Sequence, residues 1–373
     1  MKIGIIGGGQ LAQMLAQAGE KHNMQFAFLA PEEHACAADY GRHLQYPYDS
    51  QEAKDILNEW ADVITYEFES IPVSLIKAFE AKKSVHPSSL ALEITSDRLK
   101  EKTILNNLGI DTAIYSTVDS LEDLQRAITK TGLPAILKTR RDGYDGKGQV
   151  VIRNEEQLEE AIDKVKGVPC ILESMVNFDR EISIIAARNV KGDITVYPLA
   201  QNDHREGILR LSQSLIHDPM QDKAAELIKK VMDEINYVGV MAIELFDVQG
   251  TLIANEFSPR VHNSGHWSMD GASISQFENH LLAITNQTLA PVQLIANTAM
   301  VNLIGEMPDI EEIKKIPNTT IYDYGKEPRK GRKLGHINIT AQGLSHQQFM
   351  ENVRQVLAIV GEHSLSTQLA QNH

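Results

Sequence analysis

Residues 138–149, KTRRDGYDGKGQ, form a glycine-rich stretch between two apolar segments, AILKTR and QVVIR. The apolar segments are typical of β-strands and the two Asp-Gly pairs are turn signals, so the stretch predicts a hairpin with a glycine-rich tip. The glycines let backbone amides approach a phosphate chain, Lys147 adds positive charge, and Lys138 is placed to reach an inner phosphate. The stretch lacks the G-x-x-x-x-G-K-[ST] spacing of a P-loop. It therefore predicts either a different loop that closes over ATP or a solvated polar turn.

Two glutamates further along the chain, Glu244 and Glu256, lie in the apolar segments GVMAIELF and LIANEFSP, which are joined by a turn at Gln249 and Gly250. Carboxylates in such strands are costly to bury without a cation or a basic partner. A three-residue turn would place them opposite each other on one face, whereas a two-residue turn would place Glu244 opposite Asn255. Two carboxylates with Asn255 or Asn263 nearby suit magnesium bound with ATP phosphates, although a structural pair of salt-bridged glutamates would give the same pattern.

The stretch KIGIIGGGQLAQM, residues 2–14, is typical of a strand, a glycine turn and a helix. Gly7, Gly9 and Ala12 satisfy the G-x-G-x-x-G/A spacing of a dinucleotide-binding turn. The acidic residue that should follow about 20 positions later is missing, because the second strand ends in FAFLAP. The sequence therefore argues against NAD or FAD, and leaves the helix N-terminus to another anionic or sugar-bearing ligand.

The composition limits the kind of partner. The 373 residues are 42% hydrophobic and 23% charged, which is ordinary for a globular protein of two or three domains. A net charge of −14 argues against nucleic acid or an anionic membrane surface. The two cysteines are too few for a disulfide framework or a cysteine zinc site. We find no signal-peptide pattern and no apolar stretch of bilayer length, and therefore expect a cytoplasmic protein.

The pattern of strands and helices divides the chain into three parts. Residues 1–96 alternate short apolar strands with helical segments, which predicts a small α/β domain with a parallel sheet. Residues 97–292 contain helices, the glycine-rich hairpin, further strands and the strand pair with the two glutamates, which indicates an α+β unit. Residues 293–373 are small and mixed, and we expect them to form a C-terminal lobe.

Taken together, these motifs resemble those of ATP-grasp ligases. GYDGKGQ, ILESMV, EISII, AIELF and NEFSPRVHNSGHW occur in the order seen in that superfamily. SPRVHNSGHW, GASISQFE, the GGGQL start and KEPRKGRKLGH make nearly the whole chain similar to the 5-(carboxyamino)imidazole ribonucleotide synthase family. The resemblance implies an ATP-grasp fold, with α/β and α+β parts, a Rossmann-like pre-ATP-grasp domain that faces a ribonucleotide and holds no dinucleotide, a small C-terminal lobe, and a homodimer.

The resemblance also implies a reaction and a nucleotide site. The family carboxylates 5-aminoimidazole ribonucleotide (AIR) with bicarbonate and ATP, through carboxyphosphate, in de novo purine biosynthesis, with Mg²⁺ or possibly Mn²⁺ as cofactor. Glu181 matches the family position that takes the ribose hydroxyls, and residues 173–176 match the hinge that contacts adenine. The full set that matches the ATP site is Arg98, Lys138, Gly143, Tyr144, Asp145, Gly146, Lys147, Gly148, Gln149, Glu173, Ser174, Met175, Val176, Glu181, His204, Asn255 and Glu256. The metal positions are Glu244, Asn255 and Glu256.

The second substrate site follows from the same resemblance. Its matching positions are Gln10, Glu67, Tyr144, Asp145, Arg260, His262, Asn263, Ser264, Lys326, Arg329 and Arg332. Arg260 is the candidate for holding bicarbonate, Lys138 offsets charge on the phosphates, and either Asp145 or the departing phosphate takes the amine proton. Five bases lie within eight residues of this acidic chain, and by the resemblance they bind the 5′-phosphate of AIR; a solvated or RNA-contacting loop is the alternative. These bases are Lys326, Arg329, Lys330, Arg332 and Lys333.

Three other functions stay open at this stage. One is a related ATP-grasp ligase with another substrate, such as a formate-dependent glycinamide ribonucleotide transformylase. Another is a non-catalytic nucleotide-binding regulator on the same fold, against which the full set Lys138, Glu244, Glu256 and Arg260 argues. The third is a nicotinamide oxidoreductase.

Overall fold

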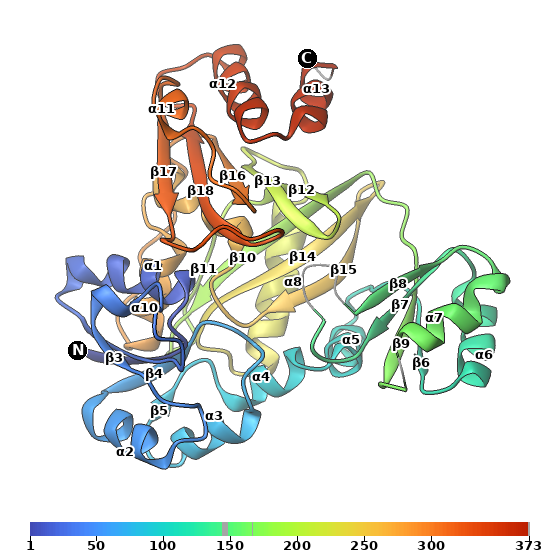
Figure 1. The fold of residues 1–373 in the computed structure, drawn as a ribbon, viewed down its shortest axis with the longest axis horizontal. Coiled ribbons are helices and arrows are strands. Elements are labelled where there is room, and N and C mark those ends of the chain that lie inside the picture. The colour runs from blue at the N-terminus through green and yellow to red at the C-terminus, as the bar shows by residue number, and fades with distance from the viewer. Residues whose placement is uncertain (144–147, 166, 372–373) are drawn as a thin grey trace.

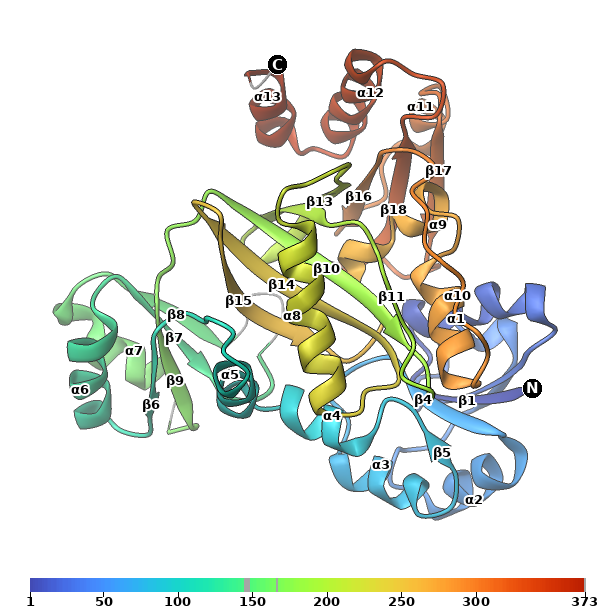
Figure 2. The ribbon, with the colours of Figure 1, turned by 180° about the vertical axis from the view of Figure 1, so that it is seen from behind.

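The computed structural model describes residues 1–143, 148–165 and 167–371 of the chain. Figure 1 shows an N-terminal unit and a small four-stranded sheet on opposite sides of a large central sheet, with the C-terminal segment beyond one end of it. Figure 2 shows the same arrangement from behind, with one long helix lying across the large sheet. None of the helices in the described ranges is long and apolar enough to cross a membrane.

The N-terminal unit is a five-stranded parallel sheet of order β3-β2-β1-β4-β5, as predicted. Its strands are β1 (Lys2–Ile6), β2 (Gln25–Leu29), β3 (Arg42–Leu44), β4 (Val63–Tyr66) and β5 (Ser84–Val85). The central strands are almost wholly apolar because helices cover both faces. One face packs on α1 (Gln10–Gly19) and α10 (Gln276–Ile284), and the other on α2 (Gln51–Trp60) and α3 (Val73–Glu80). Short elements complete the unit: η1 (Glu20–His22), η2 (Ala38–Tyr40) and α4 (Ser89–Thr95).

The glycine-rich stretch lies in a second, four-stranded sheet of order β6-β9-β7-β8, in which all pairs are antiparallel. The predicted hairpin is confirmed, since β7 pairs with β8 from Ala135 opposite Ile152 to Lys138 opposite Gln149. Its strands are β6 (Tyr115–Val118), β7 (Ala135–Thr139), β8 (Gln149–Ile152) and β9 (Cys170–Ser174). The flanking helices are α5 (Arg98–Asn107), α6 (Leu121–Thr131), η3 (Glu155–Gln157) and α7 (Leu158–Val165), of which α6 and α7 share the core of this sheet.

The large sheet has nine strands within the described residues, with the path β15-β14-β10-β12-β13-β16-β18-β17 and β11 beside β10. Its first strands are β10 (Arg180–Arg188), β11 (Ile194–Val196), β12 (Ala200–Arg205), β13 (Ile208–Ser214), β14 (Gly239–Val248) and β15 (Thr251–Ser258). Helix α8 (Gln221–Glu234) covers one face, while η4 (Asn263–Gly265), α9 (Ser268–Gly271) and α10 lie on the side toward the N-terminal unit.

The C-terminal segment continues this sheet. It adds β16 (Thr298–Ile304), β17 (Thr319–Asp323) and β18 (Lys333–Thr340), with β16 paired to β13. The helices of the segment are α11 (Ile310–Ile313), α12 (His346–Ile359) and α13 (His363–Gln371). Because β18 and β17 share the sheet with the strands that carry the glutamates, the basic segment between them is held at a fixed place relative to those carboxylates.

The turn between β14 and β15 gives a register that the sequence analysis did not foresee. Val248 pairs with Thr251, so Gln249 and Gly250, both at positive φ, form a two-residue turn. Glu244 nevertheless pairs with Glu256, because the register shifts after Glu244. The prediction that a two-residue turn would place Glu244 opposite Asn255 is therefore wrong. A β-bulge, one extra residue on β15, restores the facing carboxylates.

Candidate active site

A cavity of about 680 Å³ lies where the parts of the chain meet. Its walls come from the glycine turn before α1, the loop after β4, the start of α5, strands β12 to β15 and the segment between β17 and β18. The volume suits a nucleotide together with a second small ligand. One side of the cavity is acidic and the other is basic.

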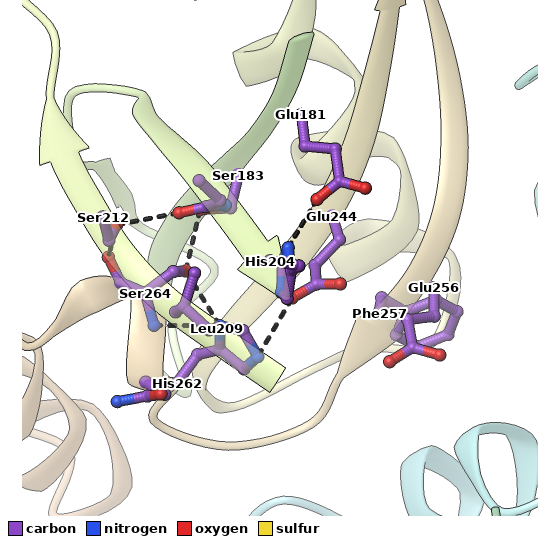
Figure 3. A network of polar contacts seen from close by, with 12 residues as sticks. Glu181, Ser183, His204, Leu209, Ser212, Glu244, Glu256, Phe257, His262 and Ser264 are labelled. Atoms are coloured by element: carbon purple, nitrogen blue, oxygen red, sulfur yellow. Dashed lines mark hydrogen bonds and ion pairs between the residues drawn. The ribbon is translucent and has the colours of Figure 1, made fainter. Parts of the chain in front are cut away.

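Glu244 and Glu256, from the neighbouring strands β14 and β15, both line this cavity (Figure 3). Burial, and then the negative charge of Glu256, raise the pKa of Glu244 above its ordinary value. Burial also opposes ionisation of Glu256, but the guanidinium of Arg98, with Nη1 2.7 Å from Oε2, outweighs burial and lowers the pKa of Glu256. Two facing, partly buried carboxylates of this kind are a suitable place for a divalent cation.

The third predicted metal ligand, Asn255, is the bulge residue and does not line the cavity. Asn263 does line it, but its side-chain amide is paired with that of Asn302. Across the described residues, no group of three or more His, Cys, Asp or Glu side chains is arranged to hold a metal ion. The two glutamates fit Mg²⁺ only if phosphate oxygens and water complete its shell, which is the usual arrangement for Mg²⁺ beside a nucleotide.

Helix α5 brings three charged side chains to the acidic side of the cavity, of which the sequence analysis singled out only Arg98. Arg98 also donates a hydrogen bond to the carbonyl of Gly143, at the start of the glycine-rich loop, over 3.3 Å. Glu101 and Lys102 are almost wholly buried, with exposed fractions of 3% and 1%. Four of the first five residues of the helix sequence RLKEKTILNN are charged, so nothing in it marks Glu101 and Lys102 as the buried ones.

Lys138 and Glu173, both predicted to contact the nucleotide, are paired with each other beside the cavity. Nζ of Lys138 lies 3.0 Å from Oε2 of Glu173, and Nζ of Lys102 lies 3.3 Å from the same oxygen. Burial lowers the pKa of Lys138, although Glu173 acts in the opposite direction. Neither Lys138 nor Glu173 lines the cavity, so their contact with a nucleotide stays a prediction.

The rest of the predicted nucleotide site is only partly gathered at the cavity. His204 lines it, and its Nδ1 is hydrogen-bonded to Oε2 of Glu181 (Figure 3). Burial opposes protonation of His204, but this bond and the negative charges of Glu244 and Glu181 together raise the pKa of His204. The remaining hinge residues, Ser174, Met175 and Val176, and the strand start at 148–149, do not line the cavity. The predicted residues Tyr144, Asp145, Gly146 and Lys147 lie outside the described residues.

Arg260 and His262 follow β15 and line the middle of the cavity. Nε of Arg260 lies 2.9 Å from Oε1 of Glu69, which belongs to the loop after β4. His262 lies with Nε2 3.5 Å from Glu244 and Nδ1 2.8 Å from Oγ of Ser264, which is wholly buried (Figure 3). Burial lowers the pKa of His262 to about 3, so His262 is neutral at ordinary pH. Ser264 itself does not line the cavity, and it contacts His262 through this hydrogen bond.

Glu67, predicted to bind the substrate, has a structural task in addition. Its carboxylate accepts hydrogen bonds from the backbone N–H groups of Gly9 and Ala12, at the N-terminus of α1. A Cβ added at Gly7 would lie 2.5 Å from the Glu67 side chain, which is why glycine is needed there. The helix N-terminus predicted to be free for a ligand is therefore occupied by a carboxylate of the chain itself, and this leaves no room for a dinucleotide pyrophosphate.

The basic side of the cavity is formed by Lys326, Arg332 and Lys333. Lys326 donates a hydrogen bond to Oε1 of Gln10 on α1, and burial lowers the pKa of Lys326. Arg329, which the sequence analysis included in this site, is exposed and does not line the cavity. Lys330 likewise does not line the cavity, so only three of the five bases do, and sequence spacing alone could not show this.

Comparisons with known proteins agree with this geometry. The ATP-grasp domain model matches residues 103–277, the ribonucleotide synthetase preATP-grasp domain model residues 1–96, and the phosphoribosylaminoimidazole carboxylase C-terminal domain model residues 298–348. The chain is 43% identical over 339 residues to the N5-carboxyaminoimidazole ribonucleotide synthase of Pseudomonas aeruginosa, which covers 91% of this chain and 94% of the relative. The chain belongs to the N5-carboxyaminoimidazole ribonucleotide synthase family.

Solved structures of this synthase family have the same fold. The Thermus thermophilus N5-carboxyaminoimidazole ribonucleotide synthetase superposes with a TM-score of 0.92 at 41% identity, over 96% of this chain and 98% of that one. The Staphylococcus aureus N5-carboxyaminoimidazole synthetase complexed with ADP superposes with a TM-score of 0.89 at 34% identity, over 94% and 95% of the two chains. The predicted ATP-grasp fold and the resemblance to this family are thus confirmed, and the nicotinamide oxidoreductase is excluded.

The structure adds cavity residues to the synthase site that the sequence analysis missed. Glu69 lies two positions after Glu67 in the sequence TYEFES, residues 65–70, so its position at the end of a strand was a usable signal. Arg140 and Arg141 precede the glycine-rich tip and both pair with Asp97 next to α5. Others reach the cavity only through the tertiary fold, namely His34, Cys36, Tyr48, Glu101 and Tyr324.

Proposed function

We propose that this chain is a ligase that carboxylates AIR with bicarbonate at the expense of ATP, giving 5-(carboxyamino)imidazole ribonucleotide, ADP and phosphate in de novo purine biosynthesis. One observation carries the proposal. A single cavity joins an acidic pair suited to a magnesium nucleotide, an arginine and a neutral histidine in the middle, and a basic wall suited to a sugar phosphate. The relatives named above carry the same activity in their names.

ATP is the first substrate. Its phosphates would lie against Arg98 and Lys138 and under the glycine-rich loop, with Glu173 to Val176, Glu181 and His204 toward the nucleoside. Glu244 and Glu256 would hold Mg²⁺, or Mn²⁺ in its place, which supplies charge neutralisation on the phosphates when bound. Arg98 now occupies Oε2 of Glu256, and it would have to share that carboxylate or turn toward a phosphate.

Bicarbonate would bind at Arg260. A bicarbonate oxygen attacks the γ-phosphorus, the bond from phosphorus to the β,γ-bridging oxygen breaks, and carboxyphosphate and ADP result. Carboxyphosphate then breaks its C–O bond to the phosphate, which leaves as inorganic phosphate beside CO₂. His262 is neutral and next to Glu244, so it can donate a hydrogen bond to these anions without adding a proton to them.

AIR would lie between the N-terminal unit and the basic wall. Its 5′-phosphate would bind Lys326, Arg332 and Lys333, with Gln10 beside Lys326. The 5-amino nitrogen attacks the carbon of CO₂ and forms the carbamate, and its proton goes to the departing phosphate or to Asp145. Because carboxyphosphate is short-lived in water, the loop of residues 143–149 would have to keep solvent out during the reaction. We also expect a cytoplasmic homodimer, which light scattering of the purified protein tests.

The decisive experiment measures ADP release with MgATP while AIR and ¹³C-bicarbonate are each supplied and withheld. We expect ADP release to require AIR, and the ¹³C label to appear in an acid-labile carbamate. ADP release that is independent of AIR, or a labelled formyl product when formate replaces bicarbonate, would assign the chain to a different ATP-grasp ligase. Equimolar ADP and carbamate would establish that ATP cleavage is coupled to carboxylation.

A further inference from the structure

The facing of Glu244 and Glu256 depends on one irregular feature, the β-bulge at Asn255. With the two-residue turn at Gln249 and Gly250, a regular ladder would pair Glu244 with Asn255. A shift of one residue in a strand moves every later side chain to the opposite face of the sheet. Glu256 would then point away from the cavity. The bulge therefore keeps the two carboxylates on the same face of the sheet, and contacts from other elements are needed to maintain it.

Two buried side chains of α5 form hydrogen bonds with the β15 backbone at this bulge, one at Asn255 and one at Phe257. Lys102 donates a hydrogen bond from Nζ to the carbonyl of Asn255 over 3.3 Å. The N–H of Phe257 donates to Oε1 of Glu101 over 2.5 Å. The residue between them, Glu256, is paired with Arg98 from the same helix. Helix α5 thus contacts three consecutive residues of β15, and each contact comes from an ionisable side chain.

Lys102 also ties this strand to the sheet of the glycine-rich hairpin. Its Nζ lies 3.3 Å from Oε2 of Glu173 on β9, the oxygen that also pairs with Lys138. Buried charges of this kind contribute little net stability, since their desolvation offsets their attraction. Their geometry gives them a different role, because Lys102 links β15, which carries Glu256, to β9, which lies next to the strand of Lys138.

We propose that Glu101 and Lys102 are positioning residues that maintain the β15 bulge and thereby the alignment of Glu256 with Glu244. Neither residue is assigned a contact with substrate, and both act through β15. The inference rests on the proposed function, in that it assigns Mg²⁺ to the two glutamates. It makes α5 responsible for metal affinity and leaves the basic end of the cavity independent of it.

The test uses substitutions on a single helix. Lys102→Met removes the bond to Asn255, Lys102→Arg retains a donor, Glu101→Met removes the acceptor for Phe257, and Glu101→Gln retains it. Lys100→Met, two positions from Lys102 and on the exposed side of the helix beside Glu93, is the matched control. Three quantities are measured: the Mg²⁺ activation constant, the KM for AIR, and Mn²⁺ binding by electron paramagnetic resonance, which requires no turnover.

We expect Lys102→Met and Glu101→Met to weaken Mg²⁺ activation and Mn²⁺ binding by about 10- to 100-fold, the range for residues that support metal ligands. The KM for AIR should stay near its wild-type value. Lys102→Arg, Glu101→Gln and Lys100→Met should bind Mn²⁺ like the wild type. Hydrogen–deuterium exchange of the metal-free protein should be faster at residues 255–258 in the two Met variants, with the rest of β14 protected.

Unchanged Mn²⁺ binding in folded Lys102→Met and Glu101→Met would overturn the proposal. If both fail to fold, the wild-type protein decides the matter, because rapid exchange of the Phe257 amide would show that Glu101 does not hold the bulge. Failure of the proposed function is distinguishable, since Glu256→Gln would then bind Mn²⁺ as tightly as the wild type. If Glu256→Gln loses metal binding but the α5 variants retain it, the metal site is correctly assigned and only the positioning role of Glu101 and Lys102 is rejected.

Discussion

The two ends of the reaction centre each contain an arginine paired with a glutamate, but the pairs are built differently. At the nucleotide end, Arg98 of α5 contacts Glu256 of β15, two elements fastened together by Glu101 and Lys102. At the carboxylation end, Arg260 contacts Glu69, which comes from the loop after β4 in the N-terminal unit. One pair joins elements that are fastened to each other, and the other joins the N-terminal unit to the segment after β15.

The difference indicates that Glu256 binds the metal ion, whereas Glu69 holds Arg260 only until bicarbonate binds. Glu256 lies opposite a second carboxylate, Glu244, and can bind a cation without moving. Until a cation binds, Arg98 neutralises its charge. Glu69 has no acidic partner across a ladder and occupies the guanidinium assigned to bicarbonate. We therefore expect removal of the charge to reduce activity at Glu256 and to improve anion binding at Glu69.

The largest effect should come from Glu256→Gln. Loss of a carboxylate that holds Mg²⁺ removes several kcal/mol of charge stabilisation from phosphoryl transfer, which corresponds to about 1,000-fold in kcat. ADP release at saturating AIR measures it. Glu234→Gln, at the end of α8 and outside the cavity, is the control. Full activity of Glu256→Gln at ordinary magnesium concentration would remove Glu256 from the metal site.

The next effect in size should come from Arg260→Ala. Loss of a donor aimed at developing negative charge typically lowers kcat about 100-fold. The KM for ATP should change little, because Arg260 lies toward the carboxylation end. Arg126→Ala provides the control, since Arg126 is exposed on α6 and its ion-pair partner among the described residues is Asp123, three positions earlier. A normal kcat together with a raised KM for ATP would transfer Arg260 to the nucleotide site.

The sequence was sufficient for the parts of this centre that depend on local pattern. The parallel sheet follows from apolar strands alternating with helices, the β7–β8 hairpin from its Asp-Gly turns, and the acidic pair from the cost of burying Glu244 and Glu256. Each of these inferences uses neighbours within one or two elements. The resemblance to the family extended them to the substrates.

The remainder depends on contacts between distant segments. The bulge at Asn255 is set by α5, about 150 residues earlier, and the second task of Glu67 is set by the amides of Gly9 and Ala12. Arg329 and Arg332 are three positions apart, yet only Arg332 lines the cavity. Register, helix capping by a remote side chain, and the direction of a loop residue are decided by tertiary packing, and local sequence does not encode them.

A smaller effect, of opposite sign, is expected from Glu69→Gln. The substitution keeps the shape of the side chain and removes the charge that competes with bicarbonate for Arg260. The pair is partly exposed, with 19% and 26% of the two side chains accessible, so its strength is that of a modest ion pair. The KM for bicarbonate should fall about fivefold. An unchanged or higher KM would mean that Glu69 does not compete for that guanidinium, and would make the two arginine pairs equivalent.

The smallest effect is a pH dependence confined to the nucleotide end. Burial and the charge of Glu256 raise the pKa of Glu244, while His204 and Lys333 act against them. Mg²⁺ needs the ionised carboxylate, so protons compete with the metal as the pH falls toward that raised pKa. We expect the dissociation constant for Mn²⁺, measured by electron paramagnetic resonance, to rise about twofold from about pH 8 to about pH 7, as competition by one proton with a pKa of about 7 requires. Glu244→Gln has no proton to lose, so its residual Mn²⁺ binding should not vary over this range. His262, with its pKa lowered to about 3 by burial, stays neutral throughout. A pH dependence of the same size in Glu244→Gln would assign the competing proton to another group.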